Sequence, residues 1–242
     1  MQEWFAKVAS AFVQTFITDD RWQIFLRGFG VTIRTAVLAL VIGIVLGVLV
    51  AIVRTQHDSG RSKKKGIGTV LLNIADVICR IYLTVIRGTP MMVQLMIMYF
   101  VIFASTRRTI LVAILAFGIN SGAYVAEIVR SGIMSVDQGQ MEAGRSLGMN
   151  YKQTMRHIII PQAIKNILPA LGNEMITLLK DTSLMTVISA KDLTKAAQTV
   201  TAVTYEPFMP YISIAVIYLV CVIALSKVLG LVERRLRASD RR

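Results

Sequence analysis

The chain has few residues of the kinds that form catalytic or metal centres. Its two cysteines, Cys79 and Cys221, lie in apolar stretches, which favours small buried packing over a disulfide or a metal site. His57 and His157 lack HExxH spacing and nearby thiolates, which argues against a catalytic metal. The sequence also lacks a GxxxxGKS/T phosphate loop and GxSxG or SxxK nucleophile motifs. We therefore expect no metal, no cofactor and no enzymatic activity on this chain.

Charge is scarce as well. Charged residues make up 17% of the chain, hydrophobic residues make up 55%, and the mean hydropathy is +0.61. Soluble chains carry about 25% charged residues. The net charge of +13 is compatible with nucleic-acid binding, but the basic residues cluster in short segments beside apolar runs. That pattern is typical of membrane orientation, so the composition predicts a membrane protein with no nucleic-acid partner.

The first 28 residues lack the basic start, apolar core and cleavage site of a signal peptide. Instead, Trp4, Val8, Phe12 and Phe16 recur at helical spacing. This spacing indicates an interfacial helix that lies along the bilayer. A terminal helix docked on the rest of the protein would show the same pattern, so both interpretations remain open.

The apolar runs predict an all-α fold, since about 20 apolar residues cross the hydrocarbon as a helix. We expect five transmembrane helices, at 29–53, 91–104, 110–128, 167–189 and 211–232. Segment 70–86 carries Asp76 and Arg80 and predicts an amphipathic or partly inserted helix. Gly43 and Gly47 form a GxxxG pair, which favours close packing of another helix.

Five spans place the two ends of the chain on opposite sides of a membrane. With the tail in the cytoplasm, the inner segments hold fourteen Lys and Arg residues, without counting Arg80, Arg87 and Arg130, and the outer segments hold seven. The positive-inside rule then predicts a multi-pass cell-membrane protein with its N-terminus outside and its C-terminus in the cytoplasm. The expected parts are an N-terminal interfacial helix at 1–28, a transmembrane domain at 29–236 and a basic tail at 237–242.

Segment 135–161 is a polar, helix-forming interruption between two apolar runs. Its helix-capping and helix-breaking residues are, in chain order, Ser135 or Asp137, Gly148, Asn150 with Gln153, and Pro161. A side-chain oxygen caps a helix start, a glycine takes the left-handed conformation at a helix end, and a proline ends or kinks a helix. The segment is therefore predicted to be a cytoplasmic helix–turn–helix that serves as a docking surface.

Polar residues inside the apolar runs are candidates for a translocation path. A charge at the bilayer centre costs about 2.5–3.5 kcal/mol on insertion scales, so such groups face a partner or an aqueous cavity. Glu127 and Arg130 lie one helical turn apart and can pair, which favours packing at this position. In the run LLKDTS, a polar wall that meets the charged ends of a zwitterion is favoured over interhelical packing. The candidates are Glu127, Glu174, Lys180, Asp181, Thr182 and Ser183.

Several ordered motifs resemble those of one transport family. They include an EAA-like loop with Glu142, Ala143, Gly148 and Pro161, the run RGTP at 87–90, AYVAE at 123–127 and LLKDTSL at 178–184. Over residues 24–236 the chain resembles the membrane permease subunit of a polar amino acid ABC importer of the histidine/glutamine-permease type.

The resemblance implies the type I ABC importer permease fold and a set of partners. A separate ATPase dimer, which holds ATP and Mg, would dock on the EAA loop at 135–161. A second permease subunit, identical or a sister, and an extracytoplasmic solute-binding protein would complete a binding-protein-dependent transport system for a polar amino acid. The implied coupling residues are Glu142, Ala143, Gly144, Ser146, Gly148, Arg156 and Pro161. The resemblance adds Arg87, Gln94 and Tyr124 to the candidate substrate path.

The sequence departs from the family pattern at a few places. Gly144 stands where the motif has a second Ala, which should loosen that helix by roughly 0.5–1 kcal/mol or allow closer contact with the ATPase. Ile160 stands where Leu is usual, and the loop at 54–69 is longer than expected. Glu174 is an additional acid that favours a cationic substrate. The alternative functions are an ion-coupled secondary amino acid transporter or channel, and a scaffold within a membrane complex.

Overall fold

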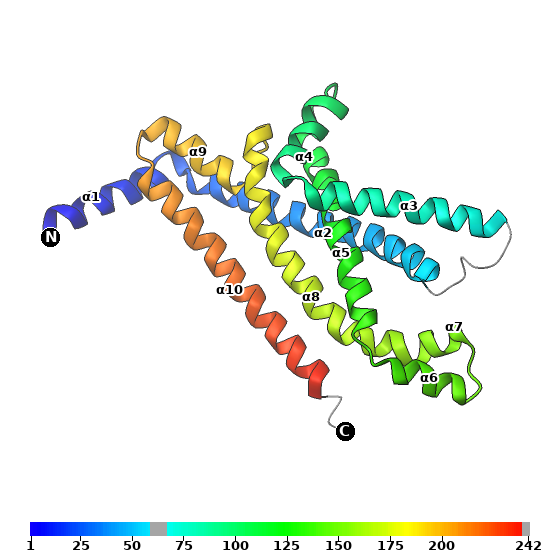
Figure 1. Ribbon diagram of the computed structural model, residues 1–242. Helices are drawn as coiled ribbons and strands as arrows, with labels where there is room; N and C mark the ends of the chain where they lie inside the picture. Colours follow the sequence, from blue (N-terminus) through cyan, green and yellow to red (C-terminus); the bar gives the residue numbers. More distant parts are fainter. Residues whose placement is uncertain (59–66, 239–242) are drawn as a thin grey trace. The chain divides into compact units, whose positions relative to one another are not determined.

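The computed structural model describes residues 1–58 and 67–238, and it shows helices joined by short turns (Figure 1). The α-helices are α1 (Gln2–Phe12), α2 (Trp22–Asp58), α3 (Ile67–Gly88), α4 (Met91–Ile97), α5 (Thr109–Met134), α6 (Gln138–Ser146), α7 (Tyr151–Thr154), α8 (Ile160–Asp181), α9 (Leu193–Thr204) and α10 (Phe208–Ala238). Turns of π-helix occupy Val13–Ile17, Met98–Ile102 and Met155–Ile159, and turns of 3-10 helix occupy Thr18–Asp20 and Thr182–Ile188. The predicted all-α class is confirmed for the described residues. The long loop expected at 54–69 and the tail at 237–242 lie partly outside them, at 59–66 and 239–242.

Four helices of the described chain, α2, α3, α5 and α10, are long and apolar enough to cross a membrane. Three of them contain the predicted spans at 29–53, 110–128 and 211–232. Helix α3 was predicted only as an amphipathic or partly inserted segment. Its charges are accommodated because Arg80 Nε donates a hydrogen bond to Asp76 Oδ2 at 2.6 Å.

The other two predicted spans differ from the structure. The one at 91–104 is a shorter apolar segment, α4 with the π-turn, and covers Met91–Ile102. The one at 167–189 falls in α8 and the 3-10 turn that follows it, because the α-helix ends at Asp181. Helix α8 contains polar residues such as Glu174 and Lys180 and is not among the four helices that are apolar enough to cross a membrane.

The chain forms two compact units. The first comprises Met1–Ala39, Met91–Phe117 and Ile176–Leu225, and the second comprises Leu40–Pro90, Gly118–Met175 and the residues from Ser226 onward. Helices α2, α5, α8 and α10 contribute residues to both units. The division predicted at residue 28 falls inside α2, which runs without a break from Trp22.

The core of the first unit is built on one face of α9. Leu193, Ala196, Ala197 and Val200 recur at helical spacing and pack with Phe25 of α2 and Ile214 of α10. The start of α9 is capped by Asp192, whose side chain accepts hydrogen bonds from the Thr194 and Lys195 N–H groups at 3.0 Å. Burial raises the pKa of Asp192, although these N–H donors oppose the shift.

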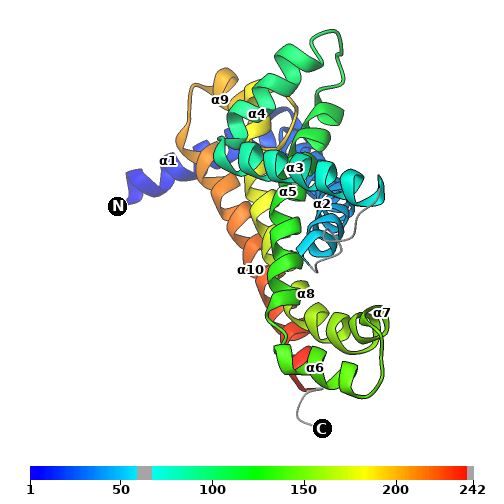
Figure 2. The same cartoon turned by 45° about the vertical axis from the view of Figure 1, so that its right-hand side comes forward.

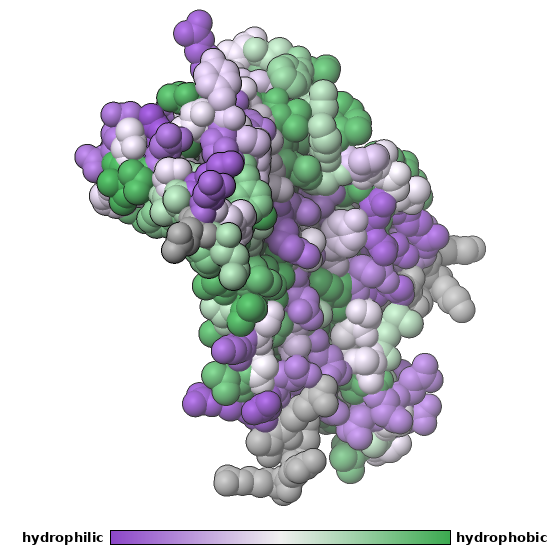
Figure 3. Space-filling model, turned by 90° about the vertical axis from the view of Figure 1, so that its left-hand side faces the viewer, coloured by the Kyte–Doolittle hydropathy of each residue, from purple (hydrophilic) through white to green (hydrophobic). Residues whose placement is uncertain are grey.

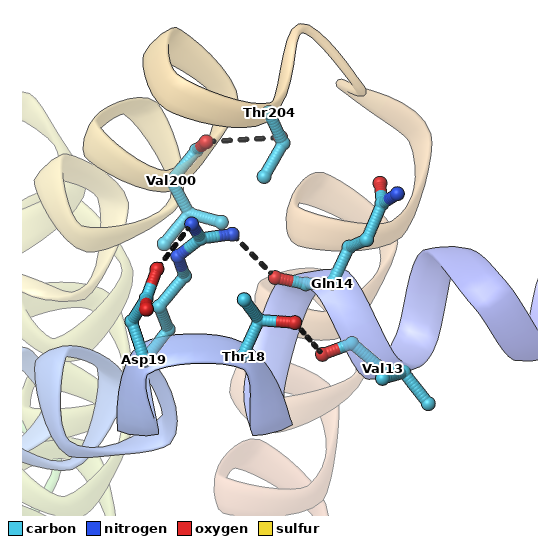
Figure 4. A network of polar contacts seen from close by, with 7 residues as sticks. Val13, Gln14, Thr18, Asp19, Val200 and Thr204 are labelled. Atoms are coloured by element: carbon cyan, nitrogen blue, oxygen red, sulfur yellow. Dashed lines mark hydrogen bonds and ion pairs between the residues drawn. The ribbon is translucent and has the colours of Figure 1, made fainter.

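A polar network fixes the turn between α1 and α2 (Figure 4). The Arg21 guanidinium donates to the Gln14 carbonyl oxygen at 2.7 Å and to Asp19 Oδ2 at 2.8 Å. Thr18 Oγ1 donates to the Val13 carbonyl oxygen at 3.2 Å. The Val13 carbonyl oxygen also accepts a hydrogen bond from the Thr18 N–H, which closes the π-turn, so these bonds hold the backbone where the helix type changes.

In the second unit, α2 packs closely on α5 through the predicted GxxxG pair. A Cβ added to Gly43 would lie 2.7 Å from Ser121 Oγ, and one added to Gly47 would lie 2.6 Å from Val125 Cβ. The absence of these side chains lets the two helices approach, as expected of small residues in membrane proteins.

Large apolar side chains remain exposed along the candidate spans. Val45 of α2 is 57% exposed and Leu219 of α10 is 58% exposed. On the face shown in Figure 3, hydrophobic residues cover wide areas between hydrophilic patches. An apolar surface of this extent is unusual for a soluble monomer and is suited to lipid or to another subunit.

Candidate functional site

The EAA-like loop begins with α6, which is capped as the sequence predicts. Of the two candidate caps, Asp137 is the one used, because its Oδ1 accepts a hydrogen bond from the Gly139 N–H at 2.6 Å. Gly148 adopts the predicted left-handed conformation, with φ +83°. Its N–H donates to the Arg145 carbonyl oxygen at 3.0 Å, which satisfies an acceptor at the helix end.

The second helix of the loop starts with the predicted capping box. Asn150 Oδ1 accepts from the Gln153 N–H at 3.0 Å, and Gln153 Oε1 accepts from the Asn150 N–H at 2.8 Å. Of the two predicted effects of Pro161, to end or to kink this helix, the first is wrong, because the helical path continues through α7, the π-turn and α8 to Asp181. Proline crowds the carbonyl group four residues earlier, and the wider π-turn immediately before α8 accommodates it.

Helices α6 and α7 lie side by side in both views (Figures 1 and 2). The close approach depends on Gly144, which is buried. A Cβ at this position would lie 2.6 Å from Thr154 Cγ2 and 3.0 Å from Ile158 Cδ1. The small residue therefore serves packing inside the loop, and the closer contact with an ATPase that was one of its two predicted effects stays a prediction.

Most of the predicted coupling residues lie on the surface of this loop. Glu142, Ala143, Ser146, Gly148, Arg156 and Pro161 are exposed. Leu147, which the sequence analysis did not single out, is 81% exposed beside Gly148. A large apolar side chain that projects from a polar loop is a contact candidate. Its position next to the glycine of the turn was the available signal.

Three candidate path residues of the second unit come together around one carboxylate. Arg130 Nη2 donates to Glu127 Oε1 at 2.8 Å, which confirms the predicted pair. Arg87 Nη1 lies 3.6 Å from Glu127 Oε2, and its guanidinium carbon lies 5.8 Å from the centre of the Tyr124 ring. Two guanidinium groups and one carboxylate give this cluster a net positive charge.

The LLKDTS candidates lie where α8 ends. Lys180 is exposed and Asp181 is half-buried, as expected of neighbours that cannot share a helix face. Thr182 is buried, and its Oγ1 donates to the Leu179 carbonyl oxygen at 2.6 Å. Ser183 is half-buried in the 3-10 turn. This change from α-helix to 3-10 helix places polar side chains at an irregular part of the backbone.

The two remaining candidates lie on other helices. Gln94 is half-buried in α4, which belongs to the first unit, and Glu174 is 9% exposed in the part of α8 that belongs to the second unit. Each takes part in a polar or electrostatic interaction within the chain. A carboxylate as deeply buried as that of Glu174 requires such a partner.

A second ionic cluster, which the sequence analysis did not assign to a site, joins α2 and α3. The side chain of Asp76 is 3% exposed, and its oxygens lie 2.6 Å from Arg80 Nε, 3.7 Å from Arg54 Nε and 3.8 Å from His57 Nδ1. The contact of Asp76 with Arg80 could be predicted from the sequence, because the two residues are four apart on one helix. The others depend on the packing of α2 on α3.

The apolar helices and the capped, polar helix–turn–helix define a helical membrane protein. The model of the family described as "Binding-protein-dependent transport system inner membrane component" matches residues 67–238, and the chain belongs to this family.

Curated relatives align over most of the chain. The putative glutamine transport system permease protein GlnP of Rickettsia bellii is 36% identical over 216 residues, which are 88% of this chain and 93% of the relative. The arginine transport system permease protein ArtQ of Bacillus subtilis is 36% identical over 218 residues, which are 89% of this chain and 93% of the relative.

Solved structures share the fold. A chain of an amino acid ABC transporter crystallised with histidines is 42% identical and superposes with a TM-score of 0.80, over 91% of this chain and 98% of that chain. A chain of the inward-facing methionine ABC transporter MetNI is 18% identical, with a TM-score of 0.72 over 89% of this chain and 97% of that chain. This second likeness concerns the fold alone.

Proposed function

We propose that this chain is the membrane permease subunit of an ATP-driven ABC importer for a polar amino acid. The observation that carries the proposal is the folded EAA-like loop, an exposed helical hairpin with capped ends inside the segment that matches the family. Relatives named as glutamine and arginine permeases support a polar amino acid as the substrate. Membership in this family disfavours the ion-coupled transporter or channel.

The proposed topology has five crossings, made by α2, α3, α5, α8 and α10. It differs from the prediction in using α3 in place of the short apolar segment at 91–104. The charge asymmetry is retained and supports a multi-pass protein with an outer N-terminus and an inner C-terminus. The exposed aromatic residues Trp4 and Phe12 of α1 support an interfacial helix at the outer surface.

In this topology the loop at 135–161 lies in the cytoplasm and docks a separate ATPase. The hairpin is stiffened by its two caps and by the Gly144 contact with Thr154. From Tyr151 the chain stays helical into α8, which ends at the candidate path residues Lys180 and Asp181. A displacement of the loop by ATP-driven closure of the ATPase would therefore be transmitted along α8.

The permease would work with a second permease subunit, identical or a sister, and would receive its substrate from an extracytoplasmic solute-binding protein. Binding of a zwitterion requires groups of both charges. The cluster around Glu127 contains the guanidinium groups of Arg87 and Arg130, which give a net positive site for a carboxylate. It also supplies an acid and the aromatic face of Tyr124 for an ammonium group. The buried acid Glu174 supports the acceptance of a cationic side chain.

Docking is tested by co-purification of the ATPase with variants of the loop. Leu147→Gln should lower the recovered ATPase about fivefold or more, because burying an exposed leucine contributes about 1.5–3 kcal/mol. Leu147→Met keeps an apolar side chain and serves as the matched control. Gly148→Val should also abolish docking, since its φ of +83° strains a branched residue. Recovery of the ATPase at the wild-type level with Leu147→Gln and Gly148→Val would refute the proposed docking surface.

A further inference from the structure

A cavity of about 260 Å³ lies in the second unit, where membrane helices meet the EAA-like loop. Its lining residues are Ala51, Ile52, Thr55 and Gln56 of α2, Val129 and Ile133 of α5, Tyr151 and Lys152 of α7, Met155 and Arg156 of the π-turn, and Ile160 of α8. Helices α2 and α5 are candidate membrane spans, and the loop adds the polar side chains of Tyr151, Lys152 and Arg156 to the lining. The cavity therefore has an apolar wall and a polar rim.

The rim is basic. Lys152 and Arg156 are four residues apart on consecutive helical turns, and the lining contains no carboxylate. Both side chains are exposed, and among the described residues neither forms an ion pair. Like charges at this spacing repel and destabilise a helix unless an anion neutralises them. The phenol of Tyr151 adds a hydrogen-bond donor at the same rim.

We propose that this cavity binds the headgroup of an anionic phospholipid, with its phosphate held by Lys152 and Arg156. The assignment rests on the proposed function in one respect, which is the placement of the loop at the cytoplasmic membrane surface. Basic pockets between transmembrane helices on that side bind anionic headgroups. The acyl chains would continue along exposed apolar residues at the mouth of the cavity, such as Ile52 and Ile160, which are 47% and 40% exposed.

The apolar wall favours a lipid over a free phosphate ion or a segment of the ATPase. A free anion would leave the surface formed by Ile52, Val129 and Ile133 without a partner. The wall belongs to helices that are apolar enough to lie in the bilayer, where acyl chains are present and a soluble partner is not. A lipid bound here would hold α7 against α2 and α5, so the lipid composition would set the position of the coupling loop.

The test measures lipid retention by native mass spectrometry of the purified permease, without the ATPase, in detergent that contains phosphatidylglycerol or phosphatidylcholine. In the double variant Lys152→Gln/Arg156→Gln, affinity for phosphatidylglycerol should fall about 30-fold, because each basic side chain contributes roughly fivefold and the two contributions multiply. The control pair Arg234→Gln/Arg235→Gln removes two exposed charges of α10 and should change it less than about twofold. Phosphatidylcholine retention and the thermal unfolding temperature report whether each variant is folded.

Two further arms separate the possible ligands. Val129→Phe fills the cavity and keeps both cations, so it should weaken phosphatidylglycerol binding, and millimolar inorganic phosphate should not displace the lipid. Any one of three results would overturn the proposal. Phosphate could displace the lipid, the two double variants could lose the same affinity for phosphatidylglycerol, or Val129→Phe could leave that affinity unchanged. Loss of ATPase co-purification with unchanged lipid affinity would assign the cavity to the ATPase instead. Because the permease is measured alone, a failure of the proposed ATPase docking would leave this result interpretable.

Discussion

Gly144 shows how a single missing side chain shapes the EAA-like loop. From the sequence, a glycine in a helix where the family has alanine indicates a weaker helix. In the structure the same glycine lets α6 pack against Thr154 and Ile158. Glycine at this position therefore lowers the helix propensity of α6 but allows tighter packing of the hairpin.

At this scale we predict that Gly144→Ala destabilises the loop by about 1 kcal/mol, because overpacking costs about 1–3 kcal/mol and alanine returns only about 0.5–1 kcal/mol of propensity. Hydrogen exchange of the α6 amides should accelerate. Thr154→Ser removes the nearest Cγ2 and keeps the hydroxyl that donates to the Asn150 carbonyl oxygen at 3.1 Å. The double variant should therefore recover wild-type protection. Slower exchange in Gly144→Ala alone would show that propensity outweighs packing.

Local signals in the sequence predicted local structure well. The capping box of Asn150 with Gln153 and the left-handed Gly148 are present as expected, because a cap depends on residues within one helical turn. The pair of Glu127 with Arg130 was predictable for the same reason. The contact of Arg87 with Glu127 was not, since the two residues lie on different helices and meet only through packing.

At the scale of elements, the errors of prediction have similar causes. The charges of Asp76 and Arg80 made α3 seem only partly inserted. The Asp76 carboxylate, however, pairs with Arg80 of the same helix and with Arg54 of α2. The π-turn before α8 that accommodates Pro161 leaves no clear pattern in the sequence. Hydropathy therefore located the apolar helices at 29–53, 110–128 and 211–232, whereas helix–helix packing decided how the charged segments fold.

Helix α9 offers an element-scale prediction about pH. Burial raises the pKa of Asp192, so the protonated form is favoured by the fold. That contribution is complete below the ordinary pKa of an aspartate and is lost as the pH rises through the higher pKa of the folded state. Asp192→Asn keeps a capping oxygen and carries no charge. Its stability relative to the wild type should therefore be greater at pH 7 than at pH 4, as thermal unfolding in detergent would show. A relative stability that is the same or lower at pH 7 would contradict this account.

At the scale of the whole molecule, the fold and the family describe the inner membrane component of a binding-protein-dependent transport system. The sequence lacks a phosphate loop, and the exposed hairpin at 135–161 is the surface on which we propose that an ATPase acts. Helix α8 leads from that hairpin to the LLKDTS residues, which connects the proposed docking surface to the proposed substrate path. The central claim is thus that transport depends on ATP hydrolysed by a partner.

The most direct test is uptake of a labelled polar amino acid into liposomes that contain the permease with its ATPase and binding protein. Uptake should require ATP and the ATPase, and it should stop when either is omitted. In the same assay Lys180→Met should lower the rate while the assembled complex is still recovered. Uptake by the permease alone, driven by an ion gradient without the ATPase, would contradict the central claim.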